Sequence, residues 1–122
     1  MSLVNRNRKS GFTLVEIMIV VLIIGILLAI AVPNFVKARE TSRAKSCVAN
    51  LKQVESGVQQ YAMDAKLAGT ATVAMTNLVP TYIRTEPKCP STDAAYTLTT
   101  VDARPLCPNP GTAGDANEHK LP

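Results

Sequence analysis

The sequence predicts an α+β protein: a long N-terminal α-helix packed on a small C-terminal antiparallel β-sheet. Three observations support this prediction. An apolar run extends from Phe12 to Val32, a helical hydrophobic spacing continues after Pro33, and short β-prone runs lie near the C-terminus. The chain has 122 residues, which suits one small domain beside the apolar run. The first half of the helix is therefore expected to span a membrane, and the second half to be amphipathic.

The apolar run Phe12–Val32 contains only two polar residues, Thr13 and Glu16. A helix of this length reaches about 31 Å at a rise of 1.5 Å per residue, enough to cross the ~30 Å hydrocarbon layer of a bilayer. Ala29 and Ala31 resemble a signal-peptidase site, but a signal peptide has a shorter apolar region of roughly 7–15 residues. The sequence therefore favours a retained membrane span. Basic residues lie on both sides of the run, so they do not fix its orientation.

One helix is expected from about Phe12 to Lys66, because apolar residues continue at steps of three or four after the run. Pro33 should bend this helix or remove a hydrogen bond, and Gly25 is a second weak point. Gly69 is the expected terminator. The apolar stripe of the second half consists of Ala44, Cys47, Leu51, Val54, Val58, Tyr61 and Ala65.

The C-terminal third should supply the surface on which this stripe packs. The runs AYTLTTV, residues 95–101, and ARPLC, residues 103–107, predict a β-hairpin around Asp102. The run NLVPTYI, residues 77–83, is interrupted by Pro80 and is expected to form a packed loop or an edge segment. The remaining tail is expected to be loop throughout.

The formal charge of +4 does not by itself indicate a nucleic-acid-binding protein. Arg6, Arg8 and Lys9 precede the apolar run, and without them 10 basic residues (13 − 3) face 9 acidic ones. The basic residues that follow the run are expected to form the solvated collar of a helix leaving a membrane. Contact with DNA or lipid phosphates is the alternative for these five: Lys37, Arg39, Arg43, Lys45 and Lys52.

The chain has three cysteines, and Cys89 and Cys107 flank the expected hairpin. A disulfide between them would close a loop of about 18 residues and stabilise the fold by roughly 3 kcal/mol. It would also imply an oxidising compartment. Cys47 lies on the apolar stripe, where a free cysteine behaves as a small hydrophobic residue. A bond from Cys47 to one of the others, or a cysteine-based metal site, is a weaker alternative because no C-x-x-C spacing is present.

His119, the only histidine, could be drawn into a cation site with Asp115 and Glu118. Its position in a terminal loop favours a solvated residue or one packed against the sheet, so no metal site is expected. No serine or cysteine has a recognisable base partner, and no glycine-rich phosphate loop is present. The sequence therefore predicts no catalytic residues, no cofactor and no enzymatic activity.

The segment KSGFTLVE, Lys9 to Glu16, resembles the processing signal of type IV pilins and their pseudopilin relatives. The resemblance rests on a basic leader, a glycine followed by phenylalanine, a glutamate four residues later and an apolar run. It implies a leader of residues 1–11, a membrane and filament-core helix of residues 12–36, and an amphipathic half-helix with a small β-domain in residues 37–122.

In this family a prepilin peptidase would cut between Gly11 and Phe12 and the new amino group of Phe12 would be N-methylated. Glu16 would then pair with the Phe12 amine of a neighbouring subunit and set the register of a helical filament. Gly25 and Pro33 would bracket a segment that loses helical order on assembly.

The implied partners are further copies of the chain, the peptidase, and an inner-membrane assembly platform with its ATPase. The precursor would lie in the inner membrane with its N-terminus inside and its C-terminus outside, and the product would be an extracellular filament or a periplasmic pseudopilus. A structural subunit of a pilus-like filament is the expected function. A pseudopilin of a type II secretion or DNA-uptake machine, and a single-pass anchored binding module, are the alternatives.

Overall fold

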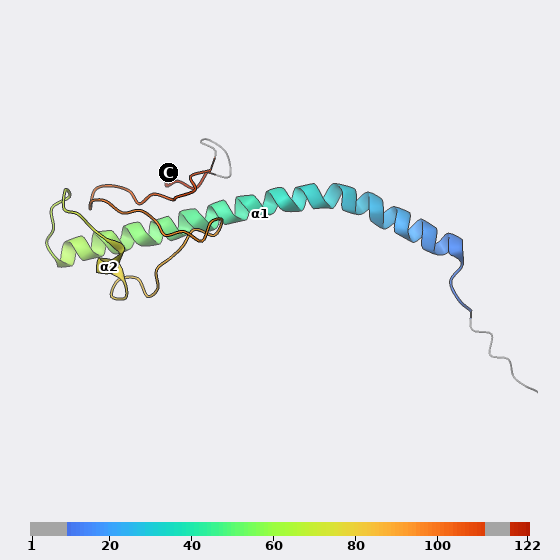
Figure 1. The fold of residues 1–122 in the computed structure, drawn as a ribbon, viewed down its shortest axis with the longest axis horizontal. Coiled ribbons are helices and arrows are strands. Elements are labelled where there is room, and N and C mark those ends of the chain that lie inside the picture. Colours follow the sequence, from blue (N-terminus) through green and yellow to red (C-terminus); the bar gives the residue numbers. More distant parts are fainter. Residues whose placement is uncertain (1–9, 112–117) are drawn as a thin grey trace, which may run out of the picture. The chain divides into compact units, whose positions relative to one another are not determined.

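A computed structural model describes residues 10–111 and 118–122, and the chain divides into two compact units between Val36 and Lys37. Helix α1, Leu14–Asp64, runs through both units, and the short helix α2, Met75–Leu78, belongs to the second (Figure 1). The expected long helix is thus confirmed, with ends two residues inside the predicted ones. Leader residues 1–9 and tail residues 112–117, which include Asp115, lie outside the described part.

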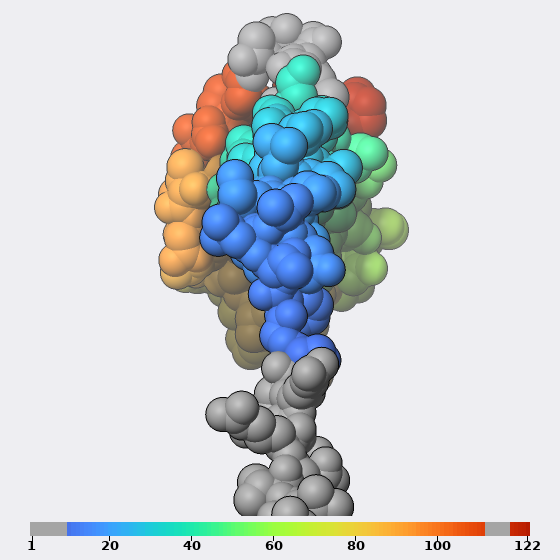
Figure 2. Space-filling view, turned by 90° about the vertical axis from the view of Figure 1, so that its right-hand side faces the viewer, coloured from blue at the N-terminus to red at the C-terminus, as the bar shows by residue number. Residues whose placement is uncertain are grey.

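The first unit consists of the apolar part of α1 and the residues just before it. Every side chain from Ser10 to Val36 is exposed, and the most apolar window of the helix has a mean hydropathy of 3.2 with none of it buried. In Figure 2 the side chains of this segment, coloured blue, lie uncovered on the face shown. The helix is long and apolar enough to cross a membrane.

The second unit contains the hydrophobic core, which is built on one stripe of α1. The predicted stripe is correct from Ala44 to Val58 and then differs: Ala62 is buried, whereas Tyr61 is half-buried and Ala65 is exposed. A helix of 3.6 residues per turn drifts relative to steps of three and four, so the later positions rotate away from the core. The unit packs Leu78, Ile83, Tyr96, Val101 and Leu121 against this stripe.

Helix α1 ends earlier than the glycine expected to terminate it. Lys66 takes a left-handed conformation with φ 52°, its N–H donates to the carbonyl of Met63, and the N–H of Leu67 donates to the carbonyl of Ala62. These two bonds form a Schellman motif, which satisfies carbonyls at the end of the helix. Gly69 instead allows a close approach: a Cβ there would lie 1.9 Å from Oδ2 of Asp102.

The predicted antiparallel sheet is not found in residues 10–111 and 118–122, where only isolated β-bridges are formed. Thr97 and Leu106 pair through two hydrogen bonds of 3.0 Å, so the two predicted runs do meet. The pairing stops there because Pro105 has no N–H to extend it. The end of the run 95–101 pairs with residues 71–73 instead. The N–H of Val73 donates to the carbonyl of Thr99, and the N–H of Val101 donates to the carbonyl of Ala71.

Candidate functional site

The processing motif lies immediately before α1 and is accessible in this structure. The side chain of Phe12 is 85% exposed, and no atom lies within 4 Å of a Cβ built on Gly11. Both residues precede Leu14, the first residue of the helix, so the Gly11–Phe12 peptide bond is outside the helical hydrogen-bond pattern. Cleavage of this bond therefore does not require α1 to unwind.

Glu16 forms a capping box with Thr13 at the start of α1. The backbone N–H of Thr13 donates to Oε2 of Glu16 at 2.9 Å, and the N–H of Glu16 donates to Oγ1 of Thr13 at 3.3 Å. This reciprocal pair satisfies two backbone donors that a helix start leaves free. This pair was not predicted, although the T-x-x-E spacing is its usual sequence signal. Glu16 is therefore hydrogen-bonded within its own chain before any neighbour is present.

The two predicted weak points of the helix both lie inside α1. The helix is continuous through Gly25 and Pro33. A Cβ at Gly25 would meet nothing within 4 Å, so no packing in this structure requires a glycine there. The loss of helical order around these residues on assembly stays a prediction.

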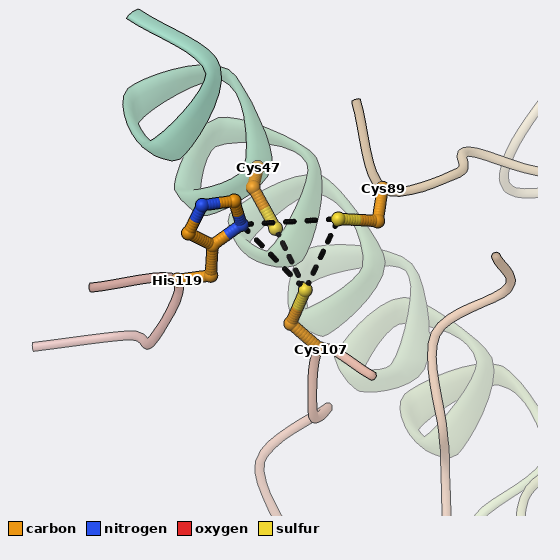
Figure 3. Close-up of side chains that lie close together, drawn as sticks. All are labelled: Cys47, Cys89, Cys107 and His119. Atoms are coloured by element: carbon orange, nitrogen blue, oxygen red, sulfur yellow. Dashed lines mark hydrogen bonds between the residues drawn. The ribbon is translucent and has the colours of Figure 1, made fainter. Parts of the chain in front are cut away.

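A second candidate site lies in the C-terminal unit, where the side chains of Cys47, Cys89, Cys107 and His119 converge (Figure 3). One ligand atom from each residue lies within 4.8 Å of all the others. All four residues are buried, with exposed fractions of 9% or less. No metal site was predicted, because the cysteines lack a C-x-x-C spacing and His119 lies in a terminal loop; the fold brings the four residues together.

Each of the four side chains comes from a different part of the unit. Cys47 lies on the buried stripe of α1. Cys89 follows the bridge residue Lys88, and its backbone exchanges hydrogen bonds with Ala94 and Asp93. Cys107 follows the bridge residue Leu106. The N–H of His119 donates to the carbonyl of Pro110, which holds the C-terminal segment against the core.

The predicted disulfide is not formed in the structure, where all three cysteines are free. The Sγ atoms of Cys89 and Cys107 lie 3.4 Å apart, well beyond the ~2.05 Å of a disulfide bond. The Sγ atom of Cys47 lies even closer to that of Cys107, at 3.2 Å. The Cys89–Cys107 bond therefore stays a prediction, with Cys47 as a competitor for the same partner.

The three thiols differ in acidity. Burial raises the pKa of the Cys47 thiol despite a hydrogen bond from Tyr96, and burial also raises the pKa of Cys107. For Cys89 burial acts in the same direction, but hydrogen bonds from the backbone of Ser91 and the side chain of Thr92 outweigh it and lower the pKa to about 6.

A polar network surrounds the cluster on one side. The hydroxyl of Tyr96 donates to Sγ of Cys47 at 3.4 Å, and Nδ2 of Asn50 donates to the same hydroxyl at 3.3 Å. Asn50 also donates to the carbonyl of Lys88 at 3.2 Å. The ring of His119 turns its Nδ1 toward the sulfurs of Cys89 and Cys107, at 3.8 Å from each. These contacts orient the four side chains toward a common centre.

The basic collar expected after the apolar run lies on the exposed and half-exposed faces of α1. Arg43 forms an ion pair with Glu40 at 3.3 Å, while Lys37, Lys45 and Lys52 are exposed. Glu40 thus neutralises the charge of Arg43, one of the basic residues of the collar. The described residues therefore give no added support for nucleic-acid binding.

Comparison with known proteins places these features in a family. Residues 6–32 match the family described as the prokaryotic N-terminal methylation motif. The chain is 33% identical over 85 residues to the ComG operon protein 3 homolog of Bacillus licheniformis, which covers 68% of this chain and 84% of that protein. No solved structure matches the chain.

Two further relatives match over shorter lengths. The type IV major pilin protein PilA of Myxococcus xanthus is 48% identical over 54 residues, or 44% of this chain and 24% of that protein. The type II secretion system core protein G of Aeromonas hydrophila is 36% identical over 59 residues, or 48% of this chain and 41% of that protein. The chain thus spans less than half the length of these two relatives. Together with the N-terminal motif and the exposed apolar helix, these matches show that the chain belongs to the type IV pilin and pseudopilin family.

Proposed function

We propose that this chain is a structural subunit of a type IV pilus-like filament, and not an enzyme. The observation that carries the proposal is the unburied apolar half of α1, which begins beside the Gly11–Phe12 bond and contains a single carboxylate, Glu16. No part of residues 10–111 and 118–122 buries the side chains of this half. This half is suited first to lipid and then to the same helix of neighbouring subunits.

Removal of the leader would provide a charge partner for the Glu16 carboxylate, which is otherwise costly to bury in a membrane. Burying an unpaired carboxylate at the centre of a membrane costs on the order of 2.5–3.5 kcal/mol. Cleavage before Phe12 creates an amino group near the depth of Glu16. The attraction between unit charges at ~4 Å is about 4 kcal/mol at an effective dielectric of about 20, comparable to that cost. Neighbours in register would pair the two charges, and neighbours out of register would leave them unpaired.

The capping box makes this proposal more specific. Before assembly, Glu16 accepts a hydrogen bond from the N–H of Thr13. A neighbour's Phe12 amine would add a charge partner to a carboxylate already held at the helix start. The inner-membrane platform, its ATPase and the prepilin peptidase with its methylase activity are the partners that this route requires.

The proposed route is tested by substituting Glu16 with Gln in a strain that has an active prepilin peptidase. The variant should be cleaved and retained in the membrane, but the sheared surface fraction should fall at least tenfold. Glu55→Gln is the charge-matched control, because Glu55 lies on the second half of α1 outside the apolar segment. Normal filament yield from Glu16→Gln would contradict the register mechanism.

Leader removal is tested separately by intact mass. Sheared filaments should contain a chain that begins at N-methylated Phe12, and Gly11→Leu should block cleavage because the peptidase is expected to require a small residue there. A chain that keeps residues 1–11 in the presence of an active peptidase would contradict processing at this bond and favour a plain membrane anchor.

A pseudopilin of a competence or secretion machine is the second candidate. The observation that favours it is the match to the ComG operon protein 3 homolog, which extends over 84% of that protein. The two functions differ in location. A processed chain in the sheared surface fraction supports a surface pilus, whereas the same chain found only in the cell envelope supports a pseudopilus.

A further inference from the structure

We propose that Cys47, Cys89, Cys107 and His119 form a structural Zn²⁺ site that fastens the C-terminal segments to α1. The proposal is independent of the proposed filament function, since it concerns only the unit that begins at Lys37. Three cysteines and one histidine are one of the ligand sets of closed structural zinc sites. In this chain they include every cysteine and the only histidine.

The spacing of the four ligand atoms fits a tetrahedral ion. Ligands about 2.0–2.3 Å from a zinc ion lie roughly 3.3–3.8 Å from one another around a tetrahedron. Four of the separations in this cluster are 3.2, 3.4, 3.8 and 3.8 Å, and all are within 4.8 Å. The sulfurs point inward from three segments, and the imidazole Nδ1 closes the fourth side (Figure 3). Binding therefore needs side-chain shifts of about 1 Å or less rather than refolding.

Zinc also explains why so many polar and reactive groups are buried together. The four side chains have exposed fractions of 0%, 1%, 9% and 4% in chain order. Within the described residues, the polar contacts of the His119 ring are the two sulfurs at 3.8 Å, which are long for hydrogen bonds. A metal ion would satisfy the imidazole and all three sulfurs at once, whereas a disulfide leaves one thiol and the imidazole over.

The charge balance of the site is simple. Binding would leave three thiolates and one neutral imidazole on the ion, with any thiol protons released to solvent, so the centre carries a single net negative charge. The hydroxyl of Tyr96 is placed to donate to the thiolate of Cys47. Asn50 in turn holds that hydroxyl, and such outer contacts orient the ligands of metal sites.

The ion would stabilise the C-terminal unit, whose described segments form no sheet. The segments after α1 are joined to one another by isolated bridges in the described residues, and small domains with little regular structure often depend on a metal or a disulfide. The ligands join α1 to the segment at Cys89, the segment at Cys107 and the C-terminal segment at His119. Zinc would thus hold three separate pieces of chain on one helix.

The first test measures metal in the full-length chain, extracted from membranes of a producing strain in detergent and without added metal. Elemental analysis should find about one zinc per chain. X-ray absorption at the zinc edge should show three sulfurs near 2.3 Å and one nitrogen near 2.0 Å. Replacement of zinc by Co²⁺ should give the intense visible bands of tetrahedral cobalt bound to thiolates.

Variants then assign the ligands. Cys107→Ser should lose bound zinc, and His119→Ala should lower zinc affinity by more than a hundredfold. Lys120→Ala is the matched control, since Lys120 is the exposed neighbour of His119, and it should keep about one zinc per chain. Tyr96→Phe removes the hydroxyl that donates to Cys47, leaves the four ligands in place and should weaken binding by roughly 10–100-fold.

Three outcomes would overturn the proposal. The first is a metal-free chain whose intact mass is two hydrogens light, which would show that a disulfide takes the sulfurs. The second is zinc bound without sulfur ligands, and the third is an unchanged zinc affinity in His119→Ala. Because the absorption spectrum is recorded on the unmodified chain, a Cys107→Ser protein that fails to fold does not weaken the test.

Discussion

The two halves of α1 are one continuous helix with opposite relations to the rest of the chain. From Leu14 to Val36 every side chain is exposed, whereas the half that begins at Lys37 buries a stripe that includes Cys47 and Leu51. The first half leaves its apolar surface for lipid or for other copies of the chain. The second half is covered by its own C-terminal segments. Both halves are thus helical, and they differ in whether the surface that covers their apolar side chains belongs to the same chain.

The halves also differ in the sequence distance of the partners that contact their polar groups. Glu16 is satisfied by Thr13, three residues away, through contacts that the helix start alone provides. The cluster around Cys47 draws on residues 42, 60 and 72 positions further along the chain. The polar groups of the first half are therefore satisfied by contacts between near neighbours, and those of the second half by contacts between residues far apart in the sequence. Substitutions matched between the halves test this contrast.

The largest effect is expected from Leu51→Ala paired with Leu27→Ala. Leu51 is fully buried, so its truncation leaves a cavity and should lower the free energy of unfolding by about 2–5 kcal/mol. Leu27 is 61% exposed, and its truncation should change that free energy by less than about 0.5 kcal/mol. The measurement is urea unfolding in detergent by tyrosine fluorescence, because all three tyrosines lie in the second unit. Equal losses would show that the two halves unfold as one body.

A smaller effect of opposite sign in the two halves is expected from Gly57→Ala and Gly25→Ala. A Cβ on Gly57 would lie 3.1 Å from Cγ1 and Cδ1 of Ile83, which is itself buried. Overpacking costs about 1–3 kcal/mol and outweighs a gain in helix propensity of about 1 kcal/mol. At Gly25 nothing lies within 4 Å, so only the gain remains. Thermal unfolding followed by circular dichroism measures both, and a stabilised Gly57→Ala would show that Ile83 repacks freely.

The smallest effect is expected at the end of α1. Lys66 has φ 52°, a region that glycine adopts without steric cost, so Lys66→Gly should raise the free energy of unfolding by about 0.5–1 kcal/mol. Lys52→Gly, on an exposed face inside the helix, should lower it by about 1 kcal/mol. Chemical denaturation of both variants gives the two signs, and a destabilising Lys66→Gly would contradict the Schellman ending.

The part of the fold that could be predicted from the sequence is the part that depends on residues close together in the chain. The apolar run, the T-x-x-E start and the steps of three and four specify α1, because helical hydrogen bonds join residues four apart. The processing motif from Lys9 to Glu16 is also a contiguous stretch, and its resemblance to the type IV pilin signal can be read directly from the sequence. The buried stripe was therefore correct up to Val58, where accumulated drift began to matter.

The pairing of the C-terminal segments and the position of His119 depend on contacts between distant parts of the chain. Two runs with β-prone composition predicted a hairpin, but Pro105 and the competing partners Ala71 and Val73 reduce it to single bridges. The ligands of the proposed zinc site follow no sequence spacing, since each comes from a different segment. Their meeting depends on how loops fold over a helix, and the energy of such contacts is not encoded in any short stretch of residues.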